Sequence, residues 1–361
     1  MLGMAGVEIG GGAPHDIVVH DRRFYARVGR DGALGLGEAY VEGWWDCPAV
    51  DQMITRILRA NLPESIRRNW RLMAGAVRAR LFNLQSLSRS FQVGEHHYDL
   101  GNDLYRVMLD RRMVYTCGYW KNAATLDEAQ EAKLDLVCRK LGLRPGMRVL
   151  ELGCGWGSFA RFAAEKYGVE VTGFSVSREQ VALGRELCAG LPVELRLEDY
   201  RRARGTFDRV LSIGIMEHIG YKNYRTYMEL VARCLAPGGV SLVHTIGGSG
   251  SEPLADAWTR KYIFPNGSLP SVAQLARATE GLFNFEDLHS FGPDYDPTLM
   301  AWYRNFVAAW PELKARLDER FYRIWTYWLL MSAAAFRSRH IHLYQIVMTP
   351  RGAPQPDCRL G

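Results

Sequence analysis

Cysteine is scarce in this chain, and no two cysteines are close enough to form a C-x-x-C pair. The seven cysteines among 361 residues are an odd number, which argues against the disulfide framework of a small secreted protein. Residues 1–4 also lack the basic start and the apolar stretch of a signal peptide. We therefore expect a reducing, cytoplasmic compartment.

Long apolar runs are absent as well. The longest one, residues 325–336, is bracketed by Arg323 and Arg337 and is too short to cross a bilayer, which takes about 20 apolar residues. Any membrane contact should therefore be peripheral. The chain has no internal repeat, and its 48% hydrophobic and 23% charged residues suit a globular protein with one large and one smaller domain. A net charge of +6 suits an anionic partner, either a phospholipid surface or a nucleic acid.

Strands and helices alternate from residue 147 onward. We expect strands at residues 147–152, 169–174, 193–197, 207–213 and 240–245, and a last one near residues 342–348. This alternation predicts a mostly parallel, doubly wound, Rossmann-like α/β sheet that binds its ligand at the carboxyl ends of the strands. Residues 1–84 predict a small N-terminal domain, α/β or mainly helical. A linker at residues 85–99 joins it to the large domain, residues 100–361.

The first of these strands leads into a glycine-rich loop, ELGCGWG at residues 151–157. Glycine lets the backbone turn tightly and approach a ligand without a Cβ in the way. A lone G-x-G-x-G is a weak signal, because nicotinamide-binding sheets use similar loops. The close third glycine and the preceding acidic residue are similar to the first motif of Rossmann-like methyltransferases, which cradle S-adenosylmethionine. Gly153, Cys154, Gly155 and Gly157 are therefore candidate cofactor contacts, and the alternative is a plain strand-to-helix turn.

The second strand does not end in the acidic residue that commonly holds the ribose hydroxyls in such methyltransferases. Ser175, Ser177 and Gln180 stand there instead and offer hydrogen bonds. The simpler interpretation is that Ser177 and Gln180 form a capping box that starts the next helix. After the third strand, Asp199 and Tyr200 are placed to meet the adenine amine and ring.

Six further motifs carry a family resemblance. They are HYDLGN (97–102), YTCGYW (115–120), MEHIG (216–220), HTIG (244–247), KYIFPNG (261–267) and FGPDYD (291–296). In this order they resemble the cyclopropane-fatty-acyl-phospholipid synthases and the related mycolic acid cyclopropane synthases, over residues 35 to 348. The segments GLGE (35–38) and GWW (43–45) favour the bacterial phospholipid branch. The resemblance implies a class I methyltransferase domain at residues 100–361, with residues 1–84 serving lipid docking, dimerisation or both.

The resemblance also implies the site residues. A bicarbonate ion would lie beside the sulfonium methyl group and act as the base. Its cradle would consist of Cys117, Glu217, His244, Ile246 through its backbone, and Tyr295. Cofactor contacts would come from Tyr115, Thr116, the loop at 153–157, residues 175–180 and Tyr200.

The chemistry of such a reaction suits these residue types. A cis alkene that attacks the methyl carbon becomes a carbocation, and a proton must leave the former methyl group before the ring closes. Aromatic faces stabilise a cation, and Tyr115, Tyr119 and Tyr295 are candidates. His244 and the Tyr295 hydroxyl can donate to a bound anion. Glu217 either keeps a proton or accepts the hydrogen of the bicarbonate, and the sequence leaves both open.

Neither a metal nor a cysteine nucleophile is expected. The histidine pairs at 96–97 and at 340 and 342 lack zinc-ligand spacing and a third ligand. Ser332 stands where phospholipid-type relatives often carry a cysteine, so the reaction should need no thiol there. Taken alone, Cys117 would be a small buried hydrophobe and Glu217 a helix cap.

The partners follow from the resemblance and from one helix. Residues 67–84 predict an amphipathic helix whose apolar face is edged by Arg67, Arg71 and Arg78. This face is a candidate for docking on anionic lipid, and the alternative is packing within the N-terminal domain or at a dimer contact. We expect a homodimer, peripheral on the inner face of the membrane, that acts on unsaturated phospholipid acyl chains. No nucleic acid is expected, because the arginines border apolar side chains and form no groove.

Three outcomes of the chemistry stay open. The main hypothesis is ring closure to a cyclopropane. A second is the same cation chemistry ending in a methyl-branched or methylene lipid. A third is a binding module that has lost catalysis, although Glu217, His244 and Tyr295 are all present.

Overall fold

The computed structural model describes residues 2–60, 101–251 and 255–360. The predicted helix at 67–84, the domain boundary at residue 84 and the linker at 85–99 lie outside these residues.

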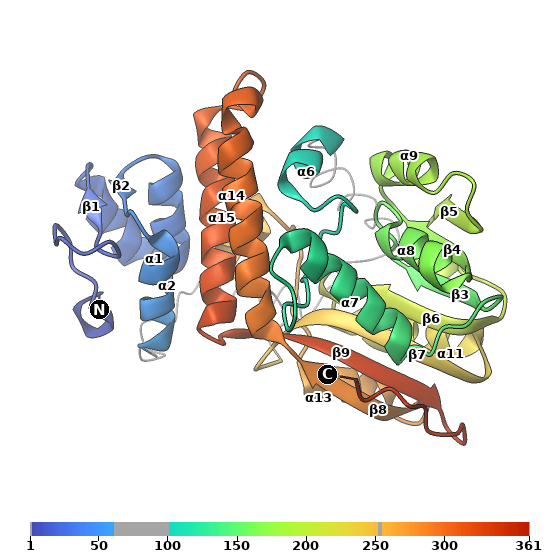
Figure 1. Cartoon of the computed structure of the whole chain (residues 1–361). Helices are drawn as coiled ribbons and strands as arrows, with labels where there is room; N and C mark the ends of the chain where they lie inside the picture. The colour runs from blue at the N-terminus through green and yellow to red at the C-terminus, as the bar shows by residue number, and fades with distance from the viewer. Residues whose placement is uncertain (1, 61–100, 252–254, 361) are drawn as a thin grey trace.

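A seven-stranded sheet forms the core of the larger part, in the order β5-β4-β3-β6-β7-β9-β8 (Figure 1). Its strands are β3 (Arg148–Leu152), β4 (Glu170–Ser175), β5 (Val193–Leu197), β6 (Phe207–Ile213), β7 (Leu235–Gly248), β8 (Phe283–Ser290) and β9 (Ile341–Pro350). The strands from β5 to β7 are parallel, whereas β9 is antiparallel to both β7 and β8. Because β3 has β4 on one side and β6 on the other, the strand order reverses there, which is where such sheets bind ligands. The prediction of a mostly parallel, doubly wound sheet is confirmed.

Two strands differ from the prediction. β7 begins at Leu235, five residues earlier than expected, because Pro237 and the two glycines after it signalled a turn. β8 was not predicted. Its pairing with β9 shifts register between Phe285 and Asp287, and such a bulge breaks the alternation of apolar and polar residues that marks a strand.

Helices cover both faces of the sheet. They are α7 (Leu126–Lys140), α8 (Ser158–Tyr167), α9 (Arg178–Leu187), α10 (Met216–Ile219), α11 (Tyr224–Cys234) and α13 (Val272–Thr279). Successive strand residues point to opposite faces. Val149 therefore packs in one cluster with α7 and α8, while its neighbour Leu150 packs in another with α11 and α13.

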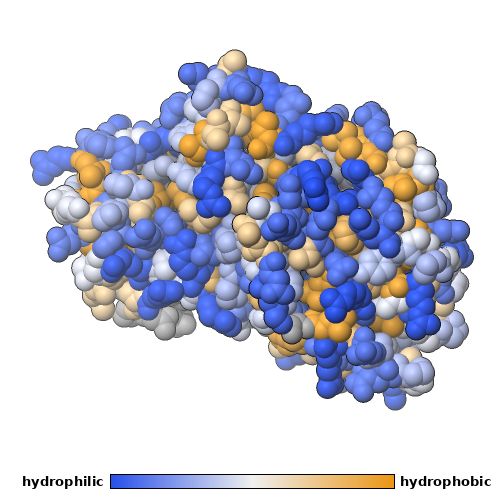
Figure 2. Space-filling model, viewed as in Figure 1, coloured by the Kyte–Doolittle hydropathy of each residue, from blue (hydrophilic) through white to orange (hydrophobic). Residues whose placement is uncertain are grey.

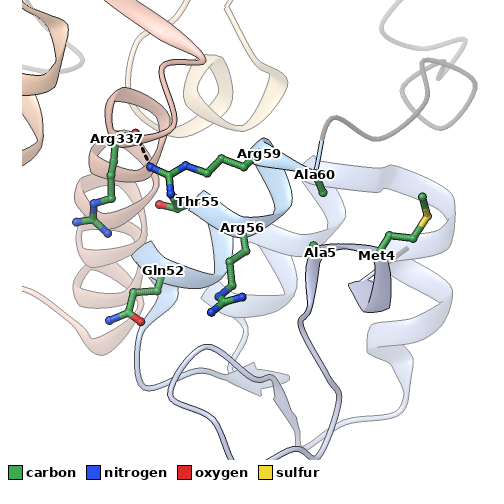
Figure 3. Close-up of a pocket in the computed structure, with 8 residues that line it drawn as sticks. All are labelled: Met4, Ala5, Gln52, Thr55, Arg56, Arg59, Ala60 and Arg337. Atoms are coloured by element: carbon green, nitrogen blue, oxygen red, sulfur yellow. Dashed lines mark hydrogen bonds between the residues drawn. The ribbon is translucent and has the colours of Figure 1, made fainter.

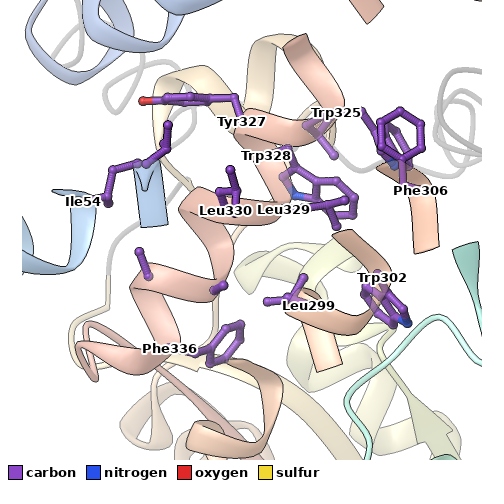
Figure 4. Close-up of a cluster of buried hydrophobic side chains, with 14 of the residues drawn as sticks. Ile54, Leu299, Trp302, Phe306, Trp325, Tyr327, Trp328, Leu329, Leu330 and Phe336 are labelled. Atoms are coloured by element: carbon purple, nitrogen blue, oxygen red, sulfur yellow. The ribbon is translucent and has the colours of Figure 1, made fainter. Parts of the chain in front are cut away.

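Two long helices, α14 (Tyr295–Leu313) and α15 (Glu319–Arg337), stand beside the sheet. The apolar run at 325–336 lies in α15. Its Trp325 and Trp328 pack with Trp302 and Phe306 of α14, as Figure 4 shows. Within the described residues, no helix is both long and apolar enough to cross a membrane.

Residues 2–60 pack on the other side of α15 (Figure 1). They comprise η1 (Leu2–Ala5), β1 (Val18–Val19), α1 (Arg23–Val41), β2 (Trp45–Asp46) and α2 (Val50–Arg59). Ion pairs tie this unit to α15, between Asp46 and Arg323 and between Asp51 and Arg337.

A cavity of ≈ 550 Å³ lies where η1, α2 and the end of α15 meet (Figure 3). Its basic side chains are Arg56, Arg59 and Arg337, and an Arg59 nitrogen donates to the main-chain oxygen of Arg337 at 3.2 Å. Met4, at its rim, is 68% exposed. The cavity is therefore a basic surface feature of the N-terminal unit where it meets α15, separate from the carboxyl ends of the strands.

In the view of Figure 2, hydrophobic residues are scattered among hydrophilic ones over the surface.

Candidate active site

The glycine loop lies at the carboxyl end of β3, as predicted. The main-chain N–H groups of Gly153 and Cys154 both donate to the oxygen of Phe174 at the end of β4, at 2.9 and 2.8 Å. Gly155 has φ +55°, and a Cβ added there would meet no atom closer than 4.0 Å, that atom being Nε2 of Gln180. The backbone at Gly155 is thus open on the side where β4 ends, which is the property that a cofactor contact needs.

Ser175 and Gln180 lie together beside this loop. The Ser175 hydroxyl donates to Oε1 of Gln180 at 3.1 Å, and both residues are buried. One of the two hydrogen bonds of the predicted capping box is present: the Ser177 hydroxyl caps α9 by accepting from the main-chain nitrogen of Gln180 at 3.3 Å. The other is absent, because the Gln180 side chain is bound to Ser175 and does not accept from the main-chain nitrogen of Ser177. This half of the prediction is therefore wrong.

Asp199 and Tyr200 follow β5, as predicted, and Arg201 holds Asp199 in place. Two Arg201 nitrogens donate to the two carboxylate oxygens of Asp199, each at 2.8 Å. The Tyr200 ring is buried against Tyr227, with centroids 5.8 Å apart. Arg201 was missed, because an arginine after a strand carries no local signal of its partner.

The segment that carries Tyr115, Thr116 and Cys117 is held between two helices. From α7, Gln130 donates to the main-chain oxygen of Thr116 at 2.7 Å, and Lys133 donates to its hydroxyl at 2.8 Å. On the other side, the hydroxyl of Thr298 in α14 accepts from the main-chain nitrogen of Gly118 at 3.1 Å. The segment is therefore fixed from both sides.

An aromatic wall surrounds Tyr115. Its ring lies 5.2 Å from Trp302 and 6.1 Å from Trp328, centroid to centroid. Trp302 in turn meets the ring of Tyr295 edge-on at 6.1 Å, and Tyr295 stacks on Phe336 at 4.4 Å. These rings join two of the predicted site residues, Tyr115 and Tyr295, through Trp302. Tyr119 lies apart from them, against Phe291 at 5.4 Å.

Glu217 and Ile246 are in direct contact. The main-chain N–H of Ile246 donates to Oε1 of Glu217 at 2.6 Å, whereas Oε2 is buried and has no hydrogen-bond partner among the described residues. Burial raises the pKa of Glu217 to about 7, because a charged carboxylate is poorly solvated there. Since its N–H is already donated to Glu217, Ile246 can serve a bound anion only by sharing that hydrogen.

His244 lies on β7, two residues before Ile246. Its Nδ1 is 3.3 Å from the amide nitrogen of Gln345 on β9. Burial lowers the pKa of His244 well below its usual value, so the ring is neutral. With the Gln345 amide as donor, Nδ1 is the acceptor and the ring hydrogen lies on Nε2, which is buried and unpartnered within the described chain. The ring also meets Phe291 at 5.9 Å, close in sequence to Tyr295.

Cys117 is fully buried and its thiol is protonated. Burial raises its pKa well above the usual value, and its sulfur lies 3.1 Å from the main-chain oxygen of Gly118. These are the surroundings of an unreactive thiol. Cys117 can therefore shape a site or donate a weak hydrogen bond, but it is not a nucleophile.

The fold and the site together define a Rossmann-like methyltransferase that uses S-adenosylmethionine. The parallel strands, the antiparallel strand inserted near one edge, and the open glycine loop after the first strand of the sheet are the features that place it in this class. The family model described as mycolic acid cyclopropane synthetase matches residues 85–346. The chain belongs to this family.

Individual relatives agree with this assignment. The cyclopropane-fatty-acyl-phospholipid synthase of Escherichia coli (strain K12) is 50% identical over an alignment that covers 97% of this chain and 91% of that protein. The probable fatty acid methyltransferase Rv3720 of Mycobacterium tuberculosis is 36% identical, covering 80% of this chain and 69% of its own. The crystal structure of mycolic acid cyclopropane synthase CmaA1, complexed with SAH and CTAB, is 33% identical with a TM-score of 0.67, covering 72% of this chain and 97% of that one.

Proposed function

We propose that this enzyme transfers the methyl carbon of S-adenosylmethionine to the cis double bond of unsaturated phospholipid acyl chains and closes a cyclopropane ring. The observation that carries the proposal is a pair of buried, unpartnered polar atoms in the described site, Oε2 of Glu217 and Nε2 of His244. Buried polar atoms are normally hydrogen-bonded. A small polar group beside both residues would satisfy them.

The residues at the ends of β3, β4 and β5 would hold the cofactor. The open backbone at Gly155 would receive its methionyl part, and Ser175 and Gln180 would offer hydrogen bonds to the ribose hydroxyls. Asp199 and Tyr200 would contact the adenine, and Tyr115 and Thr116 would contact the cofactor from the segment that α7 and α14 fix.

The alkene attacks the sulfonium methyl carbon and forms a carbocation on the acyl chain. The rings of Tyr115, Trp302 and Tyr295 present electron-rich faces that stabilise a cation. One hydrogen of the former methyl group then leaves as a proton, and the C–H bonding electrons close the third bond of the ring. S-adenosylhomocysteine is the other product.

The residues fit a bicarbonate ion. His244 would donate its Nε2 hydrogen, and Glu217 would hold the ion's own hydrogen or donate one of its own, since its pKa near 7 allows both states. Tyr295 and Cys117 would complete the cradle. When bound, bicarbonate supplies a small base for the departing proton.

A second product class uses the same cation. If the proton is lost from a neighbouring acyl carbon, a double bond forms within the chain and the product is a methyl-branched alkene. If a hydride first shifts to the cation from the carbon that bears the new methyl group, loss of a proton from that methyl group gives a methylene lipid instead. Rv3720 carries a methyltransferase name. The buried Glu217–His244 pair favours ring closure, because it offers a base position inside the site.

The enzyme works as a peripheral protein on the inner face of the cytoplasmic membrane, because its substrate chain lies in the bilayer. We also expect a homodimer. The helix at 67–84 and the basic surface around Arg56 and Arg59 are two docking candidates.

The decisive experiment is mass spectrometry of lipids from a host that lacks cyclopropane acids and expresses this chain. We expect unsaturated acyl chains to gain one CH2 and to resist ozonolysis, because the double bond has become a ring. A gain of one CH2 in a chain that ozone still cleaves would instead indicate a methyl-branched or methylene lipid, because both keep a double bond. No mass change would contradict the proposal.

A further inference from the structure

Lys133 is a buried lysine in the middle of α7. It has 0% relative exposure, and its Nζ donates to the Thr116 hydroxyl at 2.8 Å. No described carboxylate lies within ion-pair distance of its ammonium group. Taking an ammonium group out of water is costly unless other groups compensate, and a hydrophobic residue would pack this position at lower cost. Its presence therefore calls for a function.

Two buried acids lie in the same region. Burial raises the pKa of Glu151 to about 8 and that of Asp110 to about 6, and the charge of Lys133 opposes both shifts. Burial lowers the pKa of Lys133 itself to about 8, and the charge of Asp110 opposes this shift. Asp110 already accepts two main-chain N–H groups, from Arg112 and Val114. Within the described chain, Lys133 makes one direct hydrogen bond, which is to the Thr116 hydroxyl.

This hydrogen bond fixes the role of the Thr116 hydroxyl. An ammonium group has no acceptor, so the hydroxyl must accept from Lys133 and its own hydrogen is left to donate elsewhere. Gln130, one turn before Lys133, holds the main-chain oxygen of the same residue. The methyl group of Thr116 lies beside Gly214, at the end of β6, where an added Cβ would be 3.1 Å away. Thr116 is thus oriented at the ligand-binding edge of the sheet, with one hydrogen to donate.

S-adenosylmethionine carries one anionic group, the carboxylate of its methionyl part. We propose that Lys133 is a positioning residue that holds the Thr116 hydroxyl as a hydrogen-bond donor to this carboxylate. The inference rests on the proposed binding of the cofactor beside Thr116. A hydroxyl that accepts from a cation is polarised and donates more strongly, and the buried positive charge behind it favours an anion in front.

The test compares binding of S-adenosylmethionine with binding of decarboxylated S-adenosylmethionine by calorimetry. Wild type should prefer the carboxylated form by about tenfold or more, the size expected for a charge-assisted hydrogen bond. Lys133→Met, which keeps length and removes charge, should lose most of this preference. Thr116→Val should lose it too, and the double variant should lose no more than either single one, because the two residues act through one hydrogen bond.

Lys140→Met is the matched control. Lys140 is also buried in α7, but it pairs with Asp287 at 2.9 Å, so this variant should lose stability and keep the preference. A Lys133→Met or Thr116→Val protein that keeps the wild-type preference would overturn the inference, as would additive losses in the double variant. Failure of wild type to bind S-adenosylmethionine at all would instead overturn the proposed function.

Discussion

Glu217 uses one carboxyl oxygen to accept the main-chain N–H of Ile246 at 2.6 Å, while its other oxygen is buried and unpartnered within the described structure. The hydrogen bond holds the carboxyl group in one orientation and leaves the other oxygen available for chemistry. Burial raises the pKa of this carboxyl group to about 7. A group that titrates near neutral pH can hold or release a proton during turnover.

Removing the acid should affect turnover far more than cofactor binding. In Glu217→Gln we expect turnover to fall about 100-fold or more, while calorimetric affinity for S-adenosylmethionine changes by less than about threefold. The exposed Glu229→Gln variant is the control and should match wild type in both. An equal fall in turnover and affinity would identify Glu217 as a cofactor ligand and would refute the cradle assignment.

The same burial makes stability depend on pH. The folded-state pKa of Glu217, about 7, lies above its ordinary value near 4.5. Its favourable contribution is therefore complete below about pH 4.5 and is lost as pH rises through about 7. Glu217→Gln, which cannot ionise, should be more stable than wild type at pH 8 by up to about 3 kcal/mol and nearly equal to it at pH 4. Urea unfolding at both pH values measures the difference, and a gap that does not grow with pH would contradict it.

The sheet and the glycine loop could be predicted because their signals are local. β3, β4 and β6 carry buried apolar residues, β5 alternates apolar with charged residues, and turn residues lie between the strands, so the predicted bounds were within one residue of those observed. β8 lacked such a pattern, because its register shift removes the alternation. Its place in the sheet depends on β9, which follows more than fifty residues later.

Much of the polar site could not be predicted in this way. Gln345 reaches His244 across 101 positions of sequence, and Arg201 holds Asp199 only because of the turn after β5. Lys133 resembled an ordinary surface lysine of a helix. The one available signal was its position beside Leu134 and Val137, both buried, which places it near the apolar face of α7.

The glycine loop gives a third prediction. Gly155→Val should abolish S-adenosylmethionine binding and leave a folded protein, because an added Cβ meets no protein atom closer than 4.0 Å yet projects where the cofactor approaches. Gly190→Val is the control for backbone strain, since Gly190 also has positive φ, +82°, with open space around it. Circular dichroism should show both variants folded, with binding lost in the first alone. Undiminished affinity in a folded Gly155→Val protein would remove the loop from the cofactor site.

Membrane docking is predicted from sequence for the helix at 67–84, which lies outside the described residues. The acyl double bond lies within the bilayer, so the enzyme must dock before the chain can enter the site. Each basic residue close to an anionic surface contributes about 1 kcal/mol. An Arg67/Arg71/Arg78→Glu triple variant should therefore bind anionic vesicles weaker by on the order of 100-fold, and wild-type binding should weaken as salt rises.

Vesicle co-sedimentation across salt concentrations checks this prediction, with two comparison proteins. Arg202/Arg233/Arg351→Glu makes the same charge change at exposed positions of the large domain and should bind nearly as wild type does. Arg56/Arg59→Glu alters the basic surface of Figure 3. If only this double variant loses binding, the docking surface lies at η1 and α2, and the helix at 67–84 is structural. If the helix docks the enzyme, the triple variant alone loses binding, because charge at a surface that does not meet the lipid is screened within about 10 Å at 0.1 M salt.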